Sequence, residues 1–276
     1  AFTRSHSEKG DSAMRSNKCG SLAFLLVCLP AILGPGAAAD DLCGATIVAN
    51  LKLDQDLTCT GDGLIVGADG IKLNLDGHTI TGSGSGVGIG VTGRTNVSIS
   101  GGTVKNFEAG VRIRESTDIV VKGNEFRENS DGVDMQRFSH GNTVKDNAFW
   151  DNRARGIMLR SFSSDNTIKE NTFTGNNVGI LLFGATDSIV KENLVTASVL
   201  AGIRVNVIAT GNLILENTVA SNPAGIEFVV TPTGTAIGNT FVENTIAMNT
   251  CGLKGTYVGN TFRENVFEGN GADSCP

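Results

Sequence analysis

Two stretches of the sequence decide the fold: "NTVKDNAFWDNRARGIML" at residues 142–159 and "NTIKENTFTGNNVGILL" at residues 166–182. The second is a near copy of the first, displaced by about 24 residues. Each holds short apolar segments separated by asparagine, glycine and charged residues, and neither shows the apolar period of a helix. A repeat of roughly 20 to 50 residues is typical of solenoid proteins, so periodicity is the first property to test.

A glycine that directly precedes an apolar residue recurs about every 23 residues. The series is Gly86, Gly110, Gly132, Gly156, Gly179, Gly202, Gly225 and Gly252. After each glycine, apolar residues take the first and third places, as in "VRIRE" and "ILLFG". This alternation predicts a strand with one buried face. We expect glycine at the points where the backbone needs a positive φ.

An asparagine forms a second recurring position, with a bulky apolar residue two places later. The series is Asn124, Asn147, Asn171, Asn193, Asn217, Asn244 and Asn265. The spacing leaves no room for a helix, so each unit is predicted to be one coil of short parallel strands that buries its inner face only when coils stack. Asparagine tolerates the left-handed conformation and bonds to neighbouring backbone, which predicts an asparagine ladder at the turns.

The units match the pattern N-x-[IVF]-x-x-N-x-x-G-[IV], for example through Asn171, Phe173, Asn176, Gly179 and Ile180. Over roughly residues 63–270, the chain resembles the right-handed parallel β-helix repeat family, which includes pectate-lyase-like proteins and NosD-type periplasmic proteins. The resemblance implies an all-β fold, a single-stranded right-handed parallel β-helix of about nine turns. It leaves the subfamily unassigned, because this scaffold carries many activities.

The beginning of the chain differs from the repeat region. Residues 14–39 have the basic start, apolar run and small-residue site of a secretory signal peptide, and we interpret residues 1–13 as an upstream extension. Residues 40–276 would then form the β-helix domain of a secreted or periplasmic protein, without a membrane anchor after signal removal. The net charge of −6 argues against a nucleic-acid partner, which requires basic surface.

Four cysteines follow the signal segment, and an exported chain with an even number of cysteines suggests disulfides. Cys251 and Cys275 are about one coil apart in sequence, and stacked positions lie about 4.8 Å apart. Cys43 and Cys59 both precede the first clear coil, and a bridge between the two ends would have to span about eight coils. We therefore predict the pairs Cys43–Cys59 and Cys251–Cys275, each capping one end of the solenoid.

Stacking converts the outward positions of the glycine-led strands into columns. The second place after the glycine reads Gly88, Arg112, Asp134, Met158, Leu181, Arg204 and Glu227, and the fourth reads Gly90, Arg114, Gln136, Arg160, Phe183, Asn206 and Val229. Resemblance to polysaccharide-active members of this fold implies a substrate groove along such a face. Because arginine forks match carboxylates, we predict an acidic-polysaccharide site. Its predicted binding residues are Arg114, Gln136, Met158, Phe183, Arg204, Asn206 and Glu227.

Asp134, Arg112, Arg160 and the nearby His140 are the candidate catalytic residues. Glycoside hydrolysis needs two carboxyls about 5–9.5 Å apart, whereas Asp134 and Glu227 would be separated by about 19 Å. A lyase or epimerase needs a base at the sugar C5 proton and a cation on the carboxylate, so β-elimination or epimerisation is the chemistry that remains. The sequence signatures of pectate lyases, polygalacturonases and alginate epimerases are absent, which leaves open whether the chain is an enzyme.

A non-catalytic scaffold is the alternative, binding another protein through Met158, Leu181 and Phe183, or serving as a NosD-like accessory in metal-protein maturation. Copper sites use Met, Cys or His, which are scarce in residues 40–276, so no metal site is predicted. A column of acids precedes the repeated asparagines: Asp146, Glu170, Glu192, Glu216, Glu243 and Glu264. A hard cation such as Ca²⁺ could bridge these acids, although lysines offset the first three.

Overall fold

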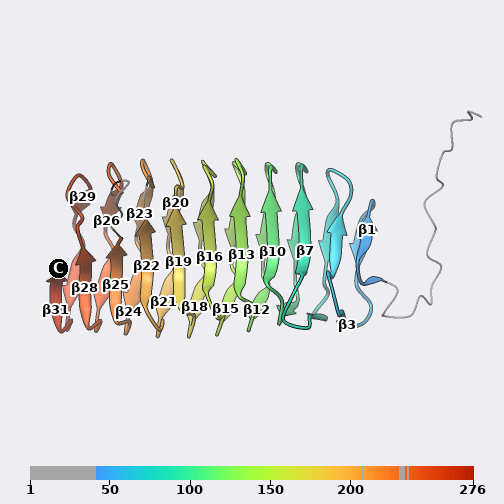
Figure 1. Cartoon of the computed structure of the whole chain (residues 1–276), viewed down its shortest axis with the longest axis horizontal. Helices are drawn as coiled ribbons and strands as arrows, with labels where there is room; N and C mark the ends of the chain where they lie inside the picture. Colours follow the sequence, from blue (N-terminus) through green and yellow to red (C-terminus); the bar gives the residue numbers. More distant parts are fainter. Residues whose placement is uncertain (1–41, 207, 230–233, 235) are drawn as a thin grey trace, which may run out of the picture. The chain divides into compact units, whose positions relative to one another are not determined.

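A computed structural model describes residues 42–276 apart from 207, 230–233 and 235. The described residues belong to one compact unit of the chain, Ala37–Pro276. Parallel strands follow one another three to a coil, and each strand pairs with the strand three places later (Figure 1). The predicted all-β parallel β-helix is therefore confirmed. The predicted signal peptide and upstream extension lie outside the described residues.

The strands form three parallel sheets, called A, B and C below. Sheet A contains β1 (Ala45–Ile47), β4 (Leu64–Val66), β7 (Val87–Thr92), β10 (Ala109–Arg114), β13 (Asp131–Gln136), β16 (Arg155–Arg160), β19 (Val178–Phe183), β22 (Ala201–Asn206), β25 (Ala224–Phe228), β28 (Cys251–Gly255) and β31 (Ala272–Cys275). Sheet B contains β2 (Leu51–Lys52), β5 (Lys72–Asn74), β8 (Ser98–Ser100), β11 (Val120–Lys122), β14 (Thr143–Lys145), β17 (Thr167–Lys169), β20 (Ile189–Lys191), β23 (Leu213–Leu215), β26 (Thr240–Val242) and β29 (Thr261–Arg263). Sheet C contains β3 (Leu57–Thr58), β6 (Thr79–Thr81), β9 (Thr103–Lys105), β12 (Glu125–Arg127), β15 (Ala148–Trp150), β18 (Thr172–Thr174), β21 (Leu194–Thr196), β24 (Thr218–Ala220), β27 (Thr245–Ala247) and β30 (Val266–Glu268).

The described strands make about ten coils, one more than predicted. The strands β1 to β6 form two coils before the first glycine of the repeat. Sheet A strands in these two coils are only three residues long, against six in β7 and β10. Their sequences lack the glycine-led pattern, so counting glycines from Gly86 missed part of the solenoid.

The core is a set of vertical stacks of inward side chains. Phe149 lies between Phe126 and Phe173, with ring centroids 5.1 and 4.6 Å away, and all three are fully buried. Each of these residues belongs to a strand of sheet C, in register with the next. Offset-stacked aromatic rings at this spacing add to the stabilisation that burial itself provides. The repeat of about 23 residues therefore gives vertical neighbours, as the sequence predicted.

The repeated asparagines form a buried ladder at the turn between sheets B and C. The Oδ1 atom of Asn171 accepts hydrogen bonds from the backbone N and the Nδ2 of Asn147, at 3.0 and 3.1 Å. The Nδ2 of Asn171 donates in turn to the carbonyl of Val144 at 2.9 Å. Each side chain thus satisfies backbone groups that a buried turn would otherwise leave unpaired. The predicted ladder is confirmed, but the repeated asparagines are not left-handed: the positive φ belongs to the residue before each, as in Asp146 (55°) and Glu170 (56°).

The repeated glycines have a different role from the one that we expected. Among them only Gly86 has a positive φ, of 74°, whereas the glycines that lead β10 to β28 do not. A Cβ on Gly156 would lie 2.5 Å from the ring of Phe173 and 2.7 Å from the carbonyl oxygen of Gly179. Close packing between the coil and the inward phenylalanine therefore requires glycine at this position. The expectation of a positive φ was wrong for the repeat.

Both predicted disulfides are present. Cys43 pairs with Cys59 at a Cα–Cα distance of 5.5 Å, and Cys251 pairs with Cys275 at 6.1 Å. The second bridge joins β28 to β31, which are neighbours in sheet A. None of the described residues forms a helix with the length and hydrophobicity that crossing a membrane requires.

Candidate functional site

The outer face of sheet A carries the predicted columns of side chains. Ile113 and Met135 point into the core and are fully buried, so the alternating residues Arg112 and Asp134 take outward positions. The strand register places Arg112 level with Asp134, and Asp134 level with Met158. The other outward neighbours are Arg114–Gln136, Met158–Leu181, Arg160–Phe183, Leu181–Arg204, Phe183–Asn206 and Arg204–Glu227.

The register corrects one level of the predicted columns. Ala109 pairs with Val87, and Arg112 is level with Gly90 instead of Gly88. The columns were counted from Gly86, which precedes β7 and has a positive φ, so the β7 level was displaced by two residues. Arg114 is consequently level with Thr92.

Asp134 lies in the middle of this face and is fully buried. Its Oδ2 accepts hydrogen bonds from Arg112 Nε at 3.2 Å and Gln136 Nε2 at 2.9 Å. Arg160 adds two more, from Nε to Oδ1 at 3.0 Å and from Nη2 to Oδ2 at 2.8 Å. Hydrogen bonding to this carboxylate raises the pKa of Arg160. With four donors and no exposed area, Asp134 holds two arginines in fixed orientations.

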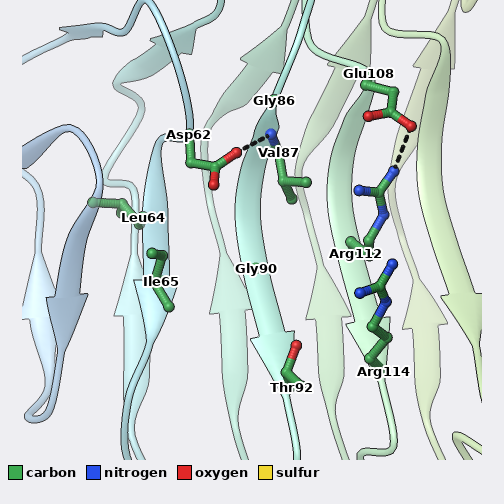
Figure 2. A pocket seen from close by; sticks show the side chains of 10 residues that line it. All are labelled: Asp62, Leu64, Ile65, Gly86, Val87, Gly90, Thr92, Glu108, Arg112 and Arg114. Carbon is green, nitrogen blue, oxygen red and sulfur yellow. Dashed lines mark hydrogen bonds and ion pairs between the residues drawn. The ribbon is translucent and has the colours of Figure 1, made fainter.

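A first hollow of about 360 Å³ lies beside Gly90. Gly90 is an outward position of β7 that has no side chain, and the space where a Cβ would stand is open. Arg112 and Arg114 of β10 form one wall of this hollow (Figure 2). Arg112 Nη2 also donates to Glu108 Oε1 at 3.0 Å. Arg114 has no ion-pair partner within the described residues, and its Nε is buried without a hydrogen bond. The remaining lining residues are Asp62, Leu64, Ile65, Gly86, Val87 and Thr92.

A second hollow of about 480 Å³ lies further along the same face, over β16, β19 and β22. Its apolar lining residues Met158, Val178 and Leu181 form a cluster separate from the main core. Three arginines, Arg155, Arg160 and Arg204, also line this hollow. Its other lining residues are Ala154, Ser161, Asn177, Phe183 and Asn206.

Two further carboxylates hold arginines at the second hollow. Arg155 Nη1 donates to both oxygens of Asp131, at 3.0 and 3.1 Å, and Arg204 Nε donates to Glu227 Oε2 at 2.6 Å. Lys254 Nζ lies 3.0 Å from the other oxygen of Glu227. Burial raises the pKa of Asp131, more than the charge of Arg155 lowers it. The predicted binding residue Glu227 therefore contacts two cations of its own sheet.

The candidate catalytic residue His140 lies in the turn between β13 and β14. Its Nδ1 is 3.3 Å from the carbonyl oxygen of Phe138, and the side chain is exposed. It pairs in register with Thr117 and Ser164 of the neighbouring turns. It lines neither hollow, whereas Arg112 and Arg160 line one each.

A family model described as periplasmic copper-binding protein (NosD) matches residues 55–273, which is most of the chain. The chain belongs to the NosD family. No curated protein sequence matches it. The NosD match extends from β3 to β31 and so covers every residue that lines the two hollows.

Solved structures show the same fold at low sequence identity. An alginate lyase from Paenibacillus sp. str. FPU-7 is 14% identical over 81% of this chain and 90% of its own, with a TM-score of 0.56. The periplasmic alginate epimerase AlgG is 15% identical over 79% of this chain and 73% of its own, with a TM-score of 0.55. The tailspike of E. coli bacteriophage HK620, in complex with a pentasaccharide, is 12% identical over 88% of this chain and 54% of its own, with a TM-score of 0.61.

The described part of this NosD chain is poor in the side chains that copper prefers. Copper favours histidine, methionine and free cysteine, but all four described cysteines are in disulfides. His78 Nδ1 contacts Asp56 Oδ1 at 3.1 Å, and Met135 is buried in the core. Within the described ranges, no group of three or more His, Cys, Asp or Glu side chains could hold a metal ion, including the acid column considered for Ca²⁺.

Sequence reasoning missed three residues that complete the face: Glu108, Asp131 and Arg155. Asp131 and Arg155 directly precede the repeated glycine, and only the places after the glycine were assigned to columns. The register Asp131–Arg155–Val178 shows that this place is a third outward column. Its signal in the sequence was the opposite charge of Asp131 and Arg155, one coil apart.

Proposed function

We propose that this protein is exported and binds an acidic polysaccharide along the outer face of sheet A. The observation that carries the proposal is Arg114, a guanidinium without a described carboxylate partner in a hollow beside Arg112. A cation left unpaired in a partly enclosed site favours an anionic ligand. The second hollow extends the same face by several coils, which suits a polymer better than a single small molecule.

The charges of the face support this choice of ligand. The chain as a whole has a net charge of −6, yet five arginines gather on this face: Arg112, Arg114, Arg155, Arg160 and Arg204. Asp131, Asp134 and Glu227 orient four of them. Guanidinium groups match carboxylates through paired donors, and orienting them in advance reduces the entropy lost on binding.

The geometry favours binding over catalysis. A general base must reach the proton that it removes, but Asp134 is fully buried and accepts four hydrogen bonds. We therefore assign Asp134 a positioning role, in which it directs Arg112 toward one hollow and Arg160 toward the other. The alginate lyase and the alginate epimerase support a polysaccharide ligand only through their shared fold.

The test measures binding of the purified protein to alginate, polygalacturonate and uncharged dextran by titration calorimetry. We expect both polyuronates to bind, more weakly at high salt, and dextran to show no binding. Arg114→Gln should weaken polyuronate binding by about 10- to 100-fold, since a hydrogen bond to a charged group contributes about 1.5–3 kcal/mol. Arg127→Gln, on the outer side of sheet C, is the control and should bind like the wild type.

Two results would overturn the proposal: no binding of either polyuronate, or equal binding by the Arg114→Gln and wild-type proteins. Absorbance of unsaturated uronate is followed in the same samples. Its appearance would show that the face also catalyses β-elimination. Its absence, together with binding, is the result that we expect.

A second candidate function is a scaffold for another protein, and one observation favours it. Phe138 and Phe162, in the turns after β13 and β16, are 67% and 55% exposed and stack with ring centroids 5.9 Å apart. Exposed aromatic side chains of this size commonly mark contact surfaces. The double substitution Phe138→Ser with Phe162→Ser should leave polyuronate binding unchanged if the first proposal is right. Loss of a cross-linked partner in periplasmic extract, without polyuronate binding by the wild type, would favour the scaffold.

A further inference from the structure

The floor of the second hollow is an apolar cluster on the outer side of sheet A. Met158, Val178 and Leu181 take outward positions, yet they are only 7%, 3% and 7% exposed. The first hollow has Gly90 at the corresponding level of its column, and space is open where a Cβ would stand. Outward positions of strands are ordinarily polar. Packing of the main core therefore does not explain why an apolar cluster lies on this side of the sheet.

Each arginine around the apolar floor is held by a carboxylate. Arg155 bonds to Asp131, Arg160 to Asp134 and Arg204 to Glu227, and each of these acidic residues is 9% exposed or less. The hydrogen bonds to Asp134 and Glu227 use Nε and Nη2, so the other amino group of each of these guanidinium groups remains available for a ligand. The result is an apolar floor with a rim of oriented cations.

We propose that this second hollow binds an acidic sugar unit that carries a short O-acyl group, an inference that rests on the proposed function. The acyl group would lie on Met158 and Leu181, while Arg160 and Arg204 contact carboxylates of the polymer. A volume of about 480 Å³ suits one substituted sugar, within the roughly 300–1,000 Å³ of ligand pockets. The first hollow, where Arg114 has no described carboxylate partner, would take a carboxylate of another unit of the polymer.

The expected size of the preference follows from the buried methyl group. Transfer of one methyl group from water to an apolar contact is worth about fourfold in affinity, the equivalent of about 0.8 kcal/mol. A polymer that seats one acetylated unit in this hollow should show this factor, because Met158 and Leu181 supply one apolar contact surface. Removing Met158 and Leu181 should abolish the preference and leave carboxylate binding intact.

The test compares O-acetylated alginate with the same sample after mild alkaline removal of its acetyl groups, a treatment that leaves chain and carboxylates unchanged. The wild type should bind the acetylated polymer about fourfold or more tightly. The double substitution Met158→Thr with Leu181→Thr should remove the difference and keep affinity for the deacetylated polymer within about twofold. Leu194→Thr is the matched control, because Leu194 is an exposed apolar residue of β21 in sheet C and lines neither hollow.

The outcomes separate the inference from the function on which it rests. Equal binding of both polymers by the wild type would overturn the acyl site and leave the acidic-polysaccharide proposal standing. Binding of neither polymer would overturn the proposed function itself. A preference that survives in the Met158→Thr, Leu181→Thr protein would place the acyl contact elsewhere and so reject this hollow. Circular dichroism of each variant confirms that the sheets have formed.

Discussion

Replacing Asp134 by asparagine should destabilise the middle of sheet A. The Oδ2 atom accepts from three donors, Arg112 Nε, Gln136 Nε2 and Arg160 Nη2, and Oδ1 accepts from Arg160 Nε. In the asparagine variant, an amide nitrogen takes the position of either Oδ1 or Oδ2. In both positions this nitrogen would face at least one N–H donor instead of an acceptor. Arg112 and Arg160 would also lose their buried counter-charge. Breaking a buried ion pair costs about 3–5 kcal/mol. The arginine side chains are 15% and 34% exposed, so we expect the lower value, about 3 kcal/mol.

Hydrogen exchange measured by mass spectrometry locates this effect. Neighbouring coils contribute separately to the stability of a solenoid, so the loss should fall on β10, β13 and β16. A cost of about 3 kcal/mol raises exchange there by roughly a hundredfold. Glu227→Gln is the control, because Glu227 holds Arg204 and Lys254 on other strands and its loss should affect β22, β25 and β28 instead.

Two results would refute the reasoning about Asp134. One is unchanged exchange in β10, β13 and β16 of the Asp134→Asn protein. The other is a destabilisation that persists when Arg112, Asp134 and Arg160 are all replaced by leucine or methionine. With no charge left buried, that triple variant should recover most of the lost stability. It should nevertheless bind polyuronates more weakly than the wild type, because two of the binding arginines are gone.

Two further predictions concern the asparagine ladder and pH. Asn171→Ala leaves the backbone N and Nδ2 of Asn147 without their acceptor, so the free energy of unfolding in urea should fall by roughly 2–4 kcal/mol; a loss below about 1 kcal/mol would contradict the ladder as a stabilising element. For Asp131, burial raises the pKa in the folded state, so its contribution to stability is complete below the unfolded value of about 3.9 and is lost as pH rises through the folded value. The stability of the wild type relative to Asp131→Asn should therefore decrease between pH 4 and pH 7 in urea titrations, and an increase over that range would show that the Arg155 ion pair outweighs burial.

The sequence was sufficient for the fold because one coil of this solenoid repeats its requirements in every turn. The inward phenylalanines recur at the repeat distance because each stacks on the one before it, as Phe126, Phe149 and Phe173 do. Their strands pair in register, and this pairing allows no other spacing. The repeat distance alone predicted that Arg112, Asp134 and Met158 lie at successive levels, as the strand register confirms. The repeat missed the two coils before Gly86 and misplaced the level of β7, where three glycines within five residues, Gly86, Gly88 and Gly90, left the register ambiguous.

The sequence could not determine how exposed each outward side chain is, or which charged group it contacts. Asp134 read as an accessible carboxylate, but in the fold two arginines and a glutamine from three different strands enclose it completely. The two hollows likewise depend on local packing. The first lies where Gly90 has no side chain, and the floor of the second is formed by the closely packed Met158 and Leu181. Periodicity fixes the level of a residue in the stack, because backbone hydrogen bonding sets one spacing for all coils. Burial, charge pairing and open volume arise only from the joint packing of several coils, and those quantities decide what this face can bind.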